Sequence, residues 1–179
     1  GPLVTRYRTW IAEQRQTPLD TAARRDLAGA LLDQCERAAD RIAAGLACAD
    51  DPDVLEAFQR ANRAMADAAR QRSPHRYRST AEGGEGRVPT WRPFQLAFLL
   101  MNLSAQADPT HAERDAVDLI FFPTGGGKTE AYLGLAAFTL VLRRLRHPGY
   151  TSGGVAVLMR YTLRLLTLDQ LGRAATLVC

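Results

Sequence analysis

Cysteine, histidine and lysine are all scarce in this sequence of 179 residues. The three cysteines, Cys35, Cys48 and Cys179, are far apart and form no C-x-x-C pair, which argues against a disulfide scaffold and against a zinc finger. The three histidines are equally isolated along the chain. No apolar run is long enough to cross a bilayer, and no secretory signal is present. We therefore expect a cytoplasmic protein with reduced cysteines and no membrane partner.

The residues that are plentiful give the composition of a globular protein. Hydrophobic residues make up 46% and charged residues 23% of the chain, which are ordinary values for folded domains. The net charge of +4 permits a nucleic-acid partner without requiring one. The chain begins with Gly1-Pro2 and not with methionine, so we expect it to be a piece of a longer protein.

The position of the only lysine is informative. Of the 23 lysines and arginines one is lysine, Lys128, and it follows three glycines in the run from Phe121 to Glu130. Glycines let backbone N–H groups curl around phosphate oxygens, and a compact ammonium reaches the β and γ phosphates where a planar guanidinium is too wide. The Thr129 hydroxyl is then placed to ligate Mg²⁺. The sequence therefore predicts a phosphate-binding loop for ATP and Mg²⁺, the alternative being a glycine-rich turn with an incidental lysine.

The loop supplies most of the predicted nucleotide-binding residues. They are Pro123, Thr124, Gly125, Gly126, Gly127, Lys128, Thr129 and Glu130. Lys128 and Thr129 have the catalytic roles among them, and Thr129 is the predicted metal ligand. We interpret the Glu130 carboxylate as a favourable charge at a helix start, and not as the catalytic base.

The segments on either side of the loop predict its structural setting. The apolar run 117–122 has the length and composition of a buried strand, and residues 131–146 those of a helix. A second apolar run, 153–159, and helical spacing from residue 163 to about 178 repeat that order. Strand–helix–strand–helix order predicts an α/β fold with a parallel sheet, whose ligands bind at the carboxyl ends of the strands.

The first half of the chain is predicted to be helical. A short helix is expected over 4–16, and Thr17-Pro18 and Asp51-Pro52 are start signals for two longer alanine-rich helices. The basic residues between Arg70 and Arg78 fit a solvated helix end better than a nucleic-acid contact. A Gly- and Glu-rich linker follows. We therefore predict a helical region over 1–78, a linker over 79–90 and a partial ATP-binding domain over 91–179.

The run from Phe122 to Glu130 resembles the first nucleotide-binding motif of superfamily 2 helicases, which often lack the initial glycine that Phe122 replaces here. Upstream, the run from Arg92 to Gln95 is similar to the glutamine motif of these enzymes. The resemblance implies that Gln95 reads the adenine edge while Phe94 or Arg92 flanks the base; a polar residue on an amphipathic helix is the alternative for Gln95. It also implies the first, incomplete part of a RecA-like P-loop domain behind the helical region.

A second resemblance concerns nucleic acid. The run from Leu158 to Arg164 occupies the place of motif Ia, whose residues grip the backbone of a bound strand. The resemblance implies DNA contacts from Arg160, Tyr161, Thr162 and Arg164. An ordinary loop with a surface arginine is the alternative. The segments 61–66 and 160–167, together with the region around Gln95, are similar to a helicase of the bacterial DISARM anti-phage system.

Together these resemblances imply a DNA-dependent ATPase, a helicase or translocase, that works with a partner subunit of the same defence system. Its acidic second motif, arginine fingers and second lobe are not recognisable before Cys179, and we expect them beyond it. The chain alone is therefore expected to be inactive. Two alternatives stay open: a P-loop NTPase or kinase without a nucleic-acid partner, and a non-catalytic nucleotide-binding interaction module.

Overall fold

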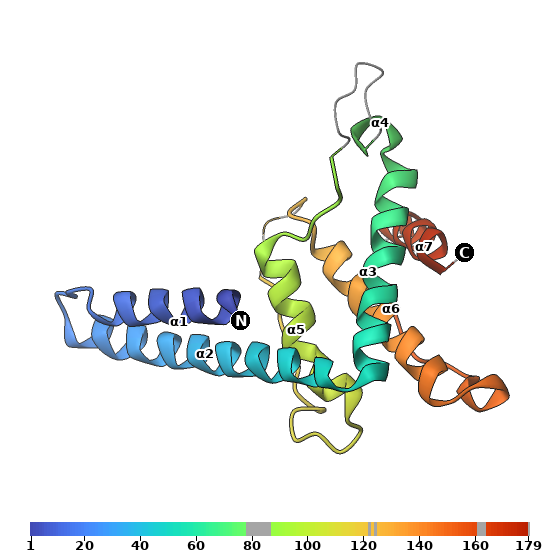
Figure 1. Ribbon diagram of the computed structural model, residues 1–179. Helices are drawn as coiled ribbons and strands as arrows, with labels where there is room; N and C mark the ends of the chain where they lie inside the picture. Colours follow the sequence, from blue (N-terminus) through green and yellow to red (C-terminus); the bar gives the residue numbers. More distant parts are fainter. Residues whose placement is uncertain (78–86, 122, 124, 161–163, 179) are drawn as a thin grey trace. The chain divides into compact units, whose positions relative to one another are not determined.

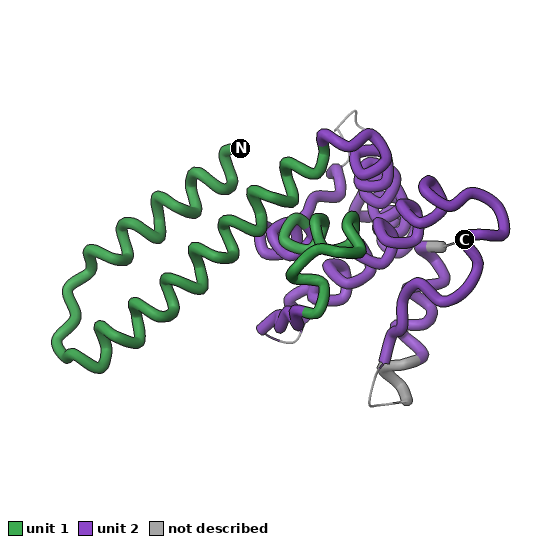
Figure 2. The backbone as a smooth tube through the Cα atoms, turned by 90° about the horizontal axis from the view of Figure 1, so that it is seen from below, with its two compact units in different colours: residues 1–49, 100–115 green, residues 50–99, 116–179 purple. Residues whose placement is uncertain are grey.

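The computed structural model describes residues 1–77, 87–121, 123, 125–160 and 164–178, and the regular structure in these ranges is helical (Figure 1). The α-helices are α1 (Pro2–Arg15), α2 (Ala22–Ala47), α3 (Pro52–Arg72), α4 (Pro74–Tyr77), α5 (Pro93–Ala107), α6 (Lys128–Arg146) and α7 (Arg164–Val178). Two short 3₁₀ turns accompany them, η1 (Cys48–Asp50) and η2 (Gly149–Ser152). The chain divides into two compact units, residues 1–49 with 100–115 and residues 50–99 with 116–179 (Figure 2).

The first unit is built on the antiparallel pair α1 and α2 (Figure 1). Ile11, Leu32 and Ala39 are buried between them, because apolar residues at helical spacing on both helices face each other. Tyr7 packs against this cluster, and burial followed by its hydrogen bond with Cys35 raises the pKa of the phenol to about 12. Salt bridges on the rim of the pair, such as Arg15 to Asp33 at 2.7 Å, lie in solvent and add little stability.

The predicted start of the second helix was wrong by four residues. Thr17-Pro18 does not open α2; Thr21 does, and its side chain accepts a hydrogen bond from the backbone N–H of Arg24 at 3.3 Å. Both threonines carry the same capping group, and the chain uses the one that lies next to the periodic apolar residues of the pair. The predicted start of the next helix was confirmed, because Asp51 caps α3 by accepting from the N–H of Asp53 at 2.8 Å.

In the second unit α3 and α6 pack against each other and run in opposite directions. At one end of the pair, Asp51 at the start of α3 accepts a hydrogen bond from Arg146 at the end of α6, at 2.6 Å. At the other end, Arg72, the last residue of α3, forms a salt bridge of 3.3 Å with Glu130 in the first turn of α6. Each pair joins a carboxylate at a helix N-terminus to an arginine at a helix C-terminus, the arrangement that both helix dipoles favour.

Close packing inside this unit depends on one small residue of α6. A Cβ on Gly134 would lie 2.7 Å from the Trp91 ring and 3.2 Å from Leu99, so only glycine admits both side chains. The Trp91 ring is fixed from the other side, because its Nε1–H donates to Asn62 of α3. Phe138 is fully buried on the same helix. The helix that follows the glycine-rich loop is thereby anchored along its length.

The α/β prediction was wrong: the described residues contain no β-strand and no parallel sheet of a RecA-like domain. Residues 117–121 and 153–159, the described residues of the two apolar runs that predicted strands, form no regular structure, and Val117, Phe121 and Leu158 are 94%, 95% and 87% exposed. A strand is stable only when its N–H and C=O groups pair with a neighbour and one face is covered. The side chains of Val117, Phe121 and Leu158 are not covered in this way, and the carbonyl of Val155 accepts from the Arg143 side chain instead of from a strand.

The predicted division into a helical region over 1–78, a linker over 79–90 and an ATP-binding domain over 91–179 stays a prediction. Most of the predicted linker, residues 79–86, lies outside the described residues. Residues 87–90, which are described, form no helix.

Candidate phosphate-binding site

The glycine-rich loop ends at a helix N-terminus, as a phosphate-binding loop requires. Gly125 and Gly127 have φ angles of 79° and 89°, in the left-handed region that favours glycine. Between them the N–H of Gly126 donates to the carbonyl of Pro123 at 3.0 Å and closes a turn. Gly127 is the N-cap of α6 and carries no capping side chain. The glycines therefore lead directly into the start of α6; Phe122 and Thr124 lie outside the described residues.

Lys128 and Thr129 are the first two residues of α6. The Lys128 ammonium donates to the Pro123 carbonyl at 3.2 Å, so its side chain folds back along the loop. The N-terminus of α6 has the partial positive charge of a helix start. An anion in front of this turn would thus meet the helix end and the Lys128 ammonium, which contacts the Pro123 carbonyl.

Gln95 and Arg92 are brought to the same loop from α5 and the residue before it. Gln95 is 4% exposed; its Oε1 accepts from the backbone N–H of Arg92 at 2.8 Å, and its Nε2 donates to the carbonyl of Gly127 at 2.7 Å. The Arg92 guanidinium donates to the carbonyl of Gly126 at 2.7 Å. Both side chains therefore brace the loop. Their predicted contacts with adenine, and that of the half-buried Phe94, stay predictions.

The brace also explains why position 127 is glycine. A Cβ there would lie 2.7 Å from Gln95 Nε2, closer than real Cβ contacts allow. At Gly125, in contrast, an added Cβ would meet nothing within 4 Å. Gly125 is therefore required by its backbone conformation alone, and Gly127 by conformation and space together.

Glu130 is the centre of a charge cluster beside the loop. Its Oε1 accepts from Arg72 of α3 at 3.3 Å and also from Arg173 of α7. Its Oε2 lies 3.4 Å from the position that a Cβ on Gly127 would occupy. Neither arginine was predicted, because no local sequence pattern shows that residues 72 and 173 meet residue 130. The prediction of Glu130 as a first-turn carboxylate is confirmed.

The predicted DNA-contact residues are described only in part. Arg160 is exposed, and Tyr161, Thr162 and the side chain of Arg164 lie outside the described residues. Gln170, which follows them in α7, is buried and donates to Asp169 at 3.3 Å. Contacts between this segment and DNA therefore stay a prediction.

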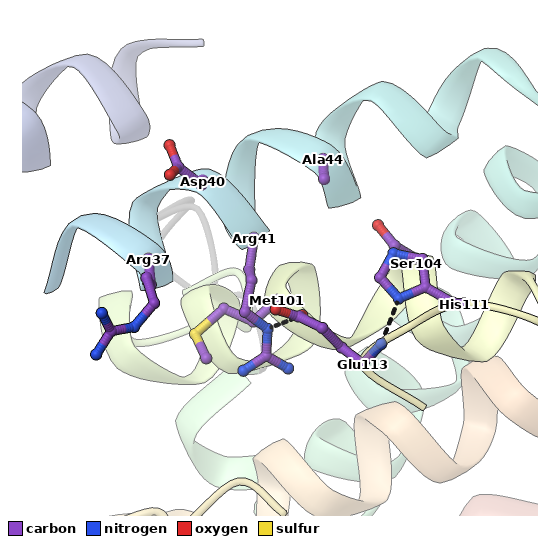
Figure 3. A pocket seen from close by; sticks show the side chains of 8 residues that line it. All are labelled: Arg37, Asp40, Arg41, Ala44, Met101, Ser104, His111 and Glu113. Carbon is purple, nitrogen blue, oxygen red and sulfur yellow. Dashed lines mark hydrogen bonds and ion pairs between the residues drawn. The ribbon is translucent and has the colours of Figure 1, made fainter. Parts of the chain in front are cut away.

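Other kinds of site are not found in the part of the chain that the structure describes. No group of three or more metal-ligating side chains occurs there, and no described helix is long and apolar enough to span a membrane. The first unit has an open pocket of about 310 Å³ (Figure 3). Two of its charged residues pair with each other, Arg41 with Glu113 at 2.6 Å, and the Glu113 N–H donates to His111 at 3.2 Å. None of the predicted site residues lines it.

Comparison with known proteins adds one relative. No family model matches the chain. The chain is 39% identical over 186 aligned residues to the DISARM protein DrmA of Bacillus paralicheniformis. The alignment covers 98% of this chain and 16% of the relative, so the chain spans about a sixth of that protein's length. The resemblance to a DISARM protein that the sequence suggested is confirmed.

Proposed function

We propose that this chain is the nucleotide-binding portion of a DNA-dependent ATPase of superfamily 2, a helicase or translocase that takes part in DISARM anti-phage defence. The single observation that carries the proposal is the loop: two left-handed glycines, a lysine at the helix start, and two side chains that brace the loop carbonyls. The similarity to DISARM protein DrmA supports the place in defence.

Recognition of ATP would use the groups that already face the loop. The N-terminus of α6 favours the phosphate charge, and Lys128 would leave the Pro123 carbonyl to contact the β and γ phosphates. The Thr129 hydroxyl would hold Mg²⁺, which neutralises the charge that develops on the transferring phosphoryl group. Gln95 and Arg92 would keep the loop carbonyls turned away from the phosphates, because they occupy the carbonyls of Gly127 and Gly126.

The remaining parts of the proposal concern partners. Arg160, with Tyr161, Thr162 and Arg164, would hold the phosphate backbone of DNA without reading its sequence. A second subunit of the same defence system would work with the full-length protein, and both would act in the cytoplasm, where phage DNA is found. Hydrolysis also needs a carboxylate that positions the attacking water, and we assign this activity to the full-length protein.

The test of the phosphate loop replaces its lysine in the full-length protein. Lys128→Ala should lower ATP turnover by orders of magnitude, roughly 10²-fold or more, because it removes a charge contact to the transferring phosphate. Lys128→Arg should be similarly inactive if a compact ammonium is required. Arg6→Ala, an exposed cation of α1, is the matched control and should leave turnover unchanged.

Circular dichroism should show the same helix content in all four proteins. Turnover by Lys128→Ala within a factor of two of the wild type would contradict the proposal. Normal turnover without any stimulation by DNA would favour an NTPase that has no nucleic-acid partner.

A further inference from the structure

The pairing of α3 with α6 brings an arginine from the N-terminal half of the chain to the phosphate loop. The two helices run in opposite directions and are tied at both ends, by Asp51 to Arg146 and by Arg72 to Glu130. The last turn of α3 therefore lies at the first turn of α6, next to the loop. Arg72 is the final residue of α3.

Two cations share one carboxylate at this point. Arg72 and Arg173 both donate to Oε1 of Glu130, while the other oxygen lies 3.4 Å from the Cβ position of Gly127. Two guanidinium groups thus meet a single carboxylate beside the loop. The two arginines come from different helices, Arg72 from α3 and Arg173 from α7, so the carboxylate holds two cations next to the loop.

The two arginines are not equivalent. The Arg173 side chain is 19% exposed and makes the closer contact, whereas the Arg72 side chain is 44% exposed and its contact is 3.3 Å long. A charge pair so exposed is weak and screened by salt. Arg72 can therefore leave Glu130 for a stronger anion, while Arg173 stays and keeps the carboxylate paired. A planar guanidinium at the end of a long side chain suits phosphate oxygens, which it binds with two parallel hydrogen bonds.

We infer that Arg72 is a further nucleotide-contacting residue, which binds the distal phosphates of a nucleoside triphosphate in the loop, and that Glu130 holds it beside the loop when no nucleotide is bound. The inference rests on the proposed nucleotide-binding function and adds a residue from outside the loop. Binding would transfer Arg72 from the carboxylate to the phosphates, so the last turn of α3 would respond to the presence of nucleotide.

The first measurement compares nucleotides of different phosphate number in the full-length protein. Equilibrium binding is measured for ATPγS, ADP and AMP with wild type, Arg72→Ala, Arg72→Lys and Arg70→Ala. Arg70 is two residues earlier on α3 and pairs with Asp67, so it is the matched control. Loss of one charge-assisted contact predicts that Arg72→Ala weakens ATPγS on the order of tenfold and AMP hardly at all, that Arg72→Lys retains part of the affinity, and that Arg70→Ala changes nothing.

The second measurement tests whether Arg72 contacts phosphate or whether its salt bridge with Glu130 only holds α3 against α6. If Arg72 contacts phosphate, Glu130→Gln releases it, ATPγS affinity stays the same or rises, and Arg72→Ala still weakens binding in the Glu130→Gln background. If the pair only holds α3 against α6, Glu130→Gln and Arg72→Ala weaken binding to a similar degree. The second change then has no further effect in the presence of the first, and the inference is overturned.

Lys128→Ala distinguishes failure of the inference from failure of the proposed function. Binding of ATPγS that depends on Lys128 but is equal in Arg72→Ala and Arg70→Ala would overturn the inference alone. Absence of ATPγS binding by the wild type would overturn the proposed function and the inference with it. Should Arg72→Ala lose helix content, Arg72→Gln keeps the length and polarity of the side chain and replaces it in both measurements.

Discussion

Gly127→Ala is the substitution whose cost the structure defines most closely. The position has a φ of 89°, and a left-handed conformation costs an L-residue about 1–2 kcal/mol. The new Cβ would also lie 2.7 Å from Gln95 Nε2, so the buried amide must move and lose its hydrogen bond to the Gly127 carbonyl. Leaving such a buried group without its partner adds about 1–3 kcal/mol. We expect a total destabilisation of about 2–5 kcal/mol.

Gly125→Ala is the matched control within the same loop. Its φ of 79° imposes a similar backbone cost, but an added Cβ would meet nothing within 4 Å. It should therefore cost only about 1–2 kcal/mol. The free energy of unfolding, obtained from urea titrations followed by circular dichroism, measures both values, and ATPγS affinity should fall further in Gly127→Ala than in Gly125→Ala.

A double variant then identifies the source of the difference. Gln95→Ala removes the amide that the new Cβ would meet, so Gln95→Ala with Gly127→Ala should cost less than the two single changes added together, by about 1 kcal/mol. Equal destabilisation by Gly127→Ala and Gly125→Ala, or additive costs in the double variant, would refute the contact between Gln95 and the loop.

Three further predictions use other parts of the chain. If Gln95 also reads adenine, Gln95→Ala should weaken ATP more than GTP in competition binding; equal losses would leave Gln95 with the bracing role alone. Arg160→Ala should weaken DNA binding about equally for all sequences, and the dependence of affinity on salt concentration should fall by the contribution of about one phosphate contact. An unchanged salt dependence would show that Arg160 does not contact the DNA backbone. Burial raises the pKa of Asp51, but hydrogen bonds from the Asp53 N–H and from Arg146 outweigh it and lower the pKa below its usual 3.8. Because the folded pKa is the lower one, this carboxylate stabilises the fold above about pH 4 and loses that effect as the pH falls through the folded pKa. Urea unfolding of Asp51→Asn should accordingly show a shallower loss of stability on acidification than wild type, and parallel curves would contradict the assignment.

The phosphate loop illustrates what can be predicted from the sequence. The requirement for glycine at positions 125 and 127 is largely a property of their own φ angles, and local requirements of this kind appear directly in the sequence. The capping of α3 by Asp51 is another, since donor and acceptor are two residues apart. Whether Thr17 or Thr21 caps α2 could not be predicted from such local requirements, because the packing of α1 on α2 decides where the buried face of α2 begins.

The predicted sheet shows where the sequence misleads. An apolar run is compatible with a buried strand, and composition cannot report whether a pairing partner exists. Residues 117–121 and 153–159 were predicted as strands from their composition but form no ladder in the part of the chain described. The hydrogen bonds of a strand are made with another segment, so strand formation is a property of two segments and not of one.

What the sequence by itself determined is therefore the chemistry of the loop: a lone lysine behind three glycines, followed by a hydroxyl and a carboxylate at the start of a helix. What only the tertiary structure decided is what surrounds that loop. Gln95 and Arg92 reach its carbonyls from 32 and 34 residues away, and Arg72 and Arg173 reach Glu130 from 58 and 43 residues away. The physical reason is range: φ angles and caps act over a few neighbouring residues, whereas these contacts exist only because packing within the second unit brings α3, α7 and the residues around Gln95 to the start of α6.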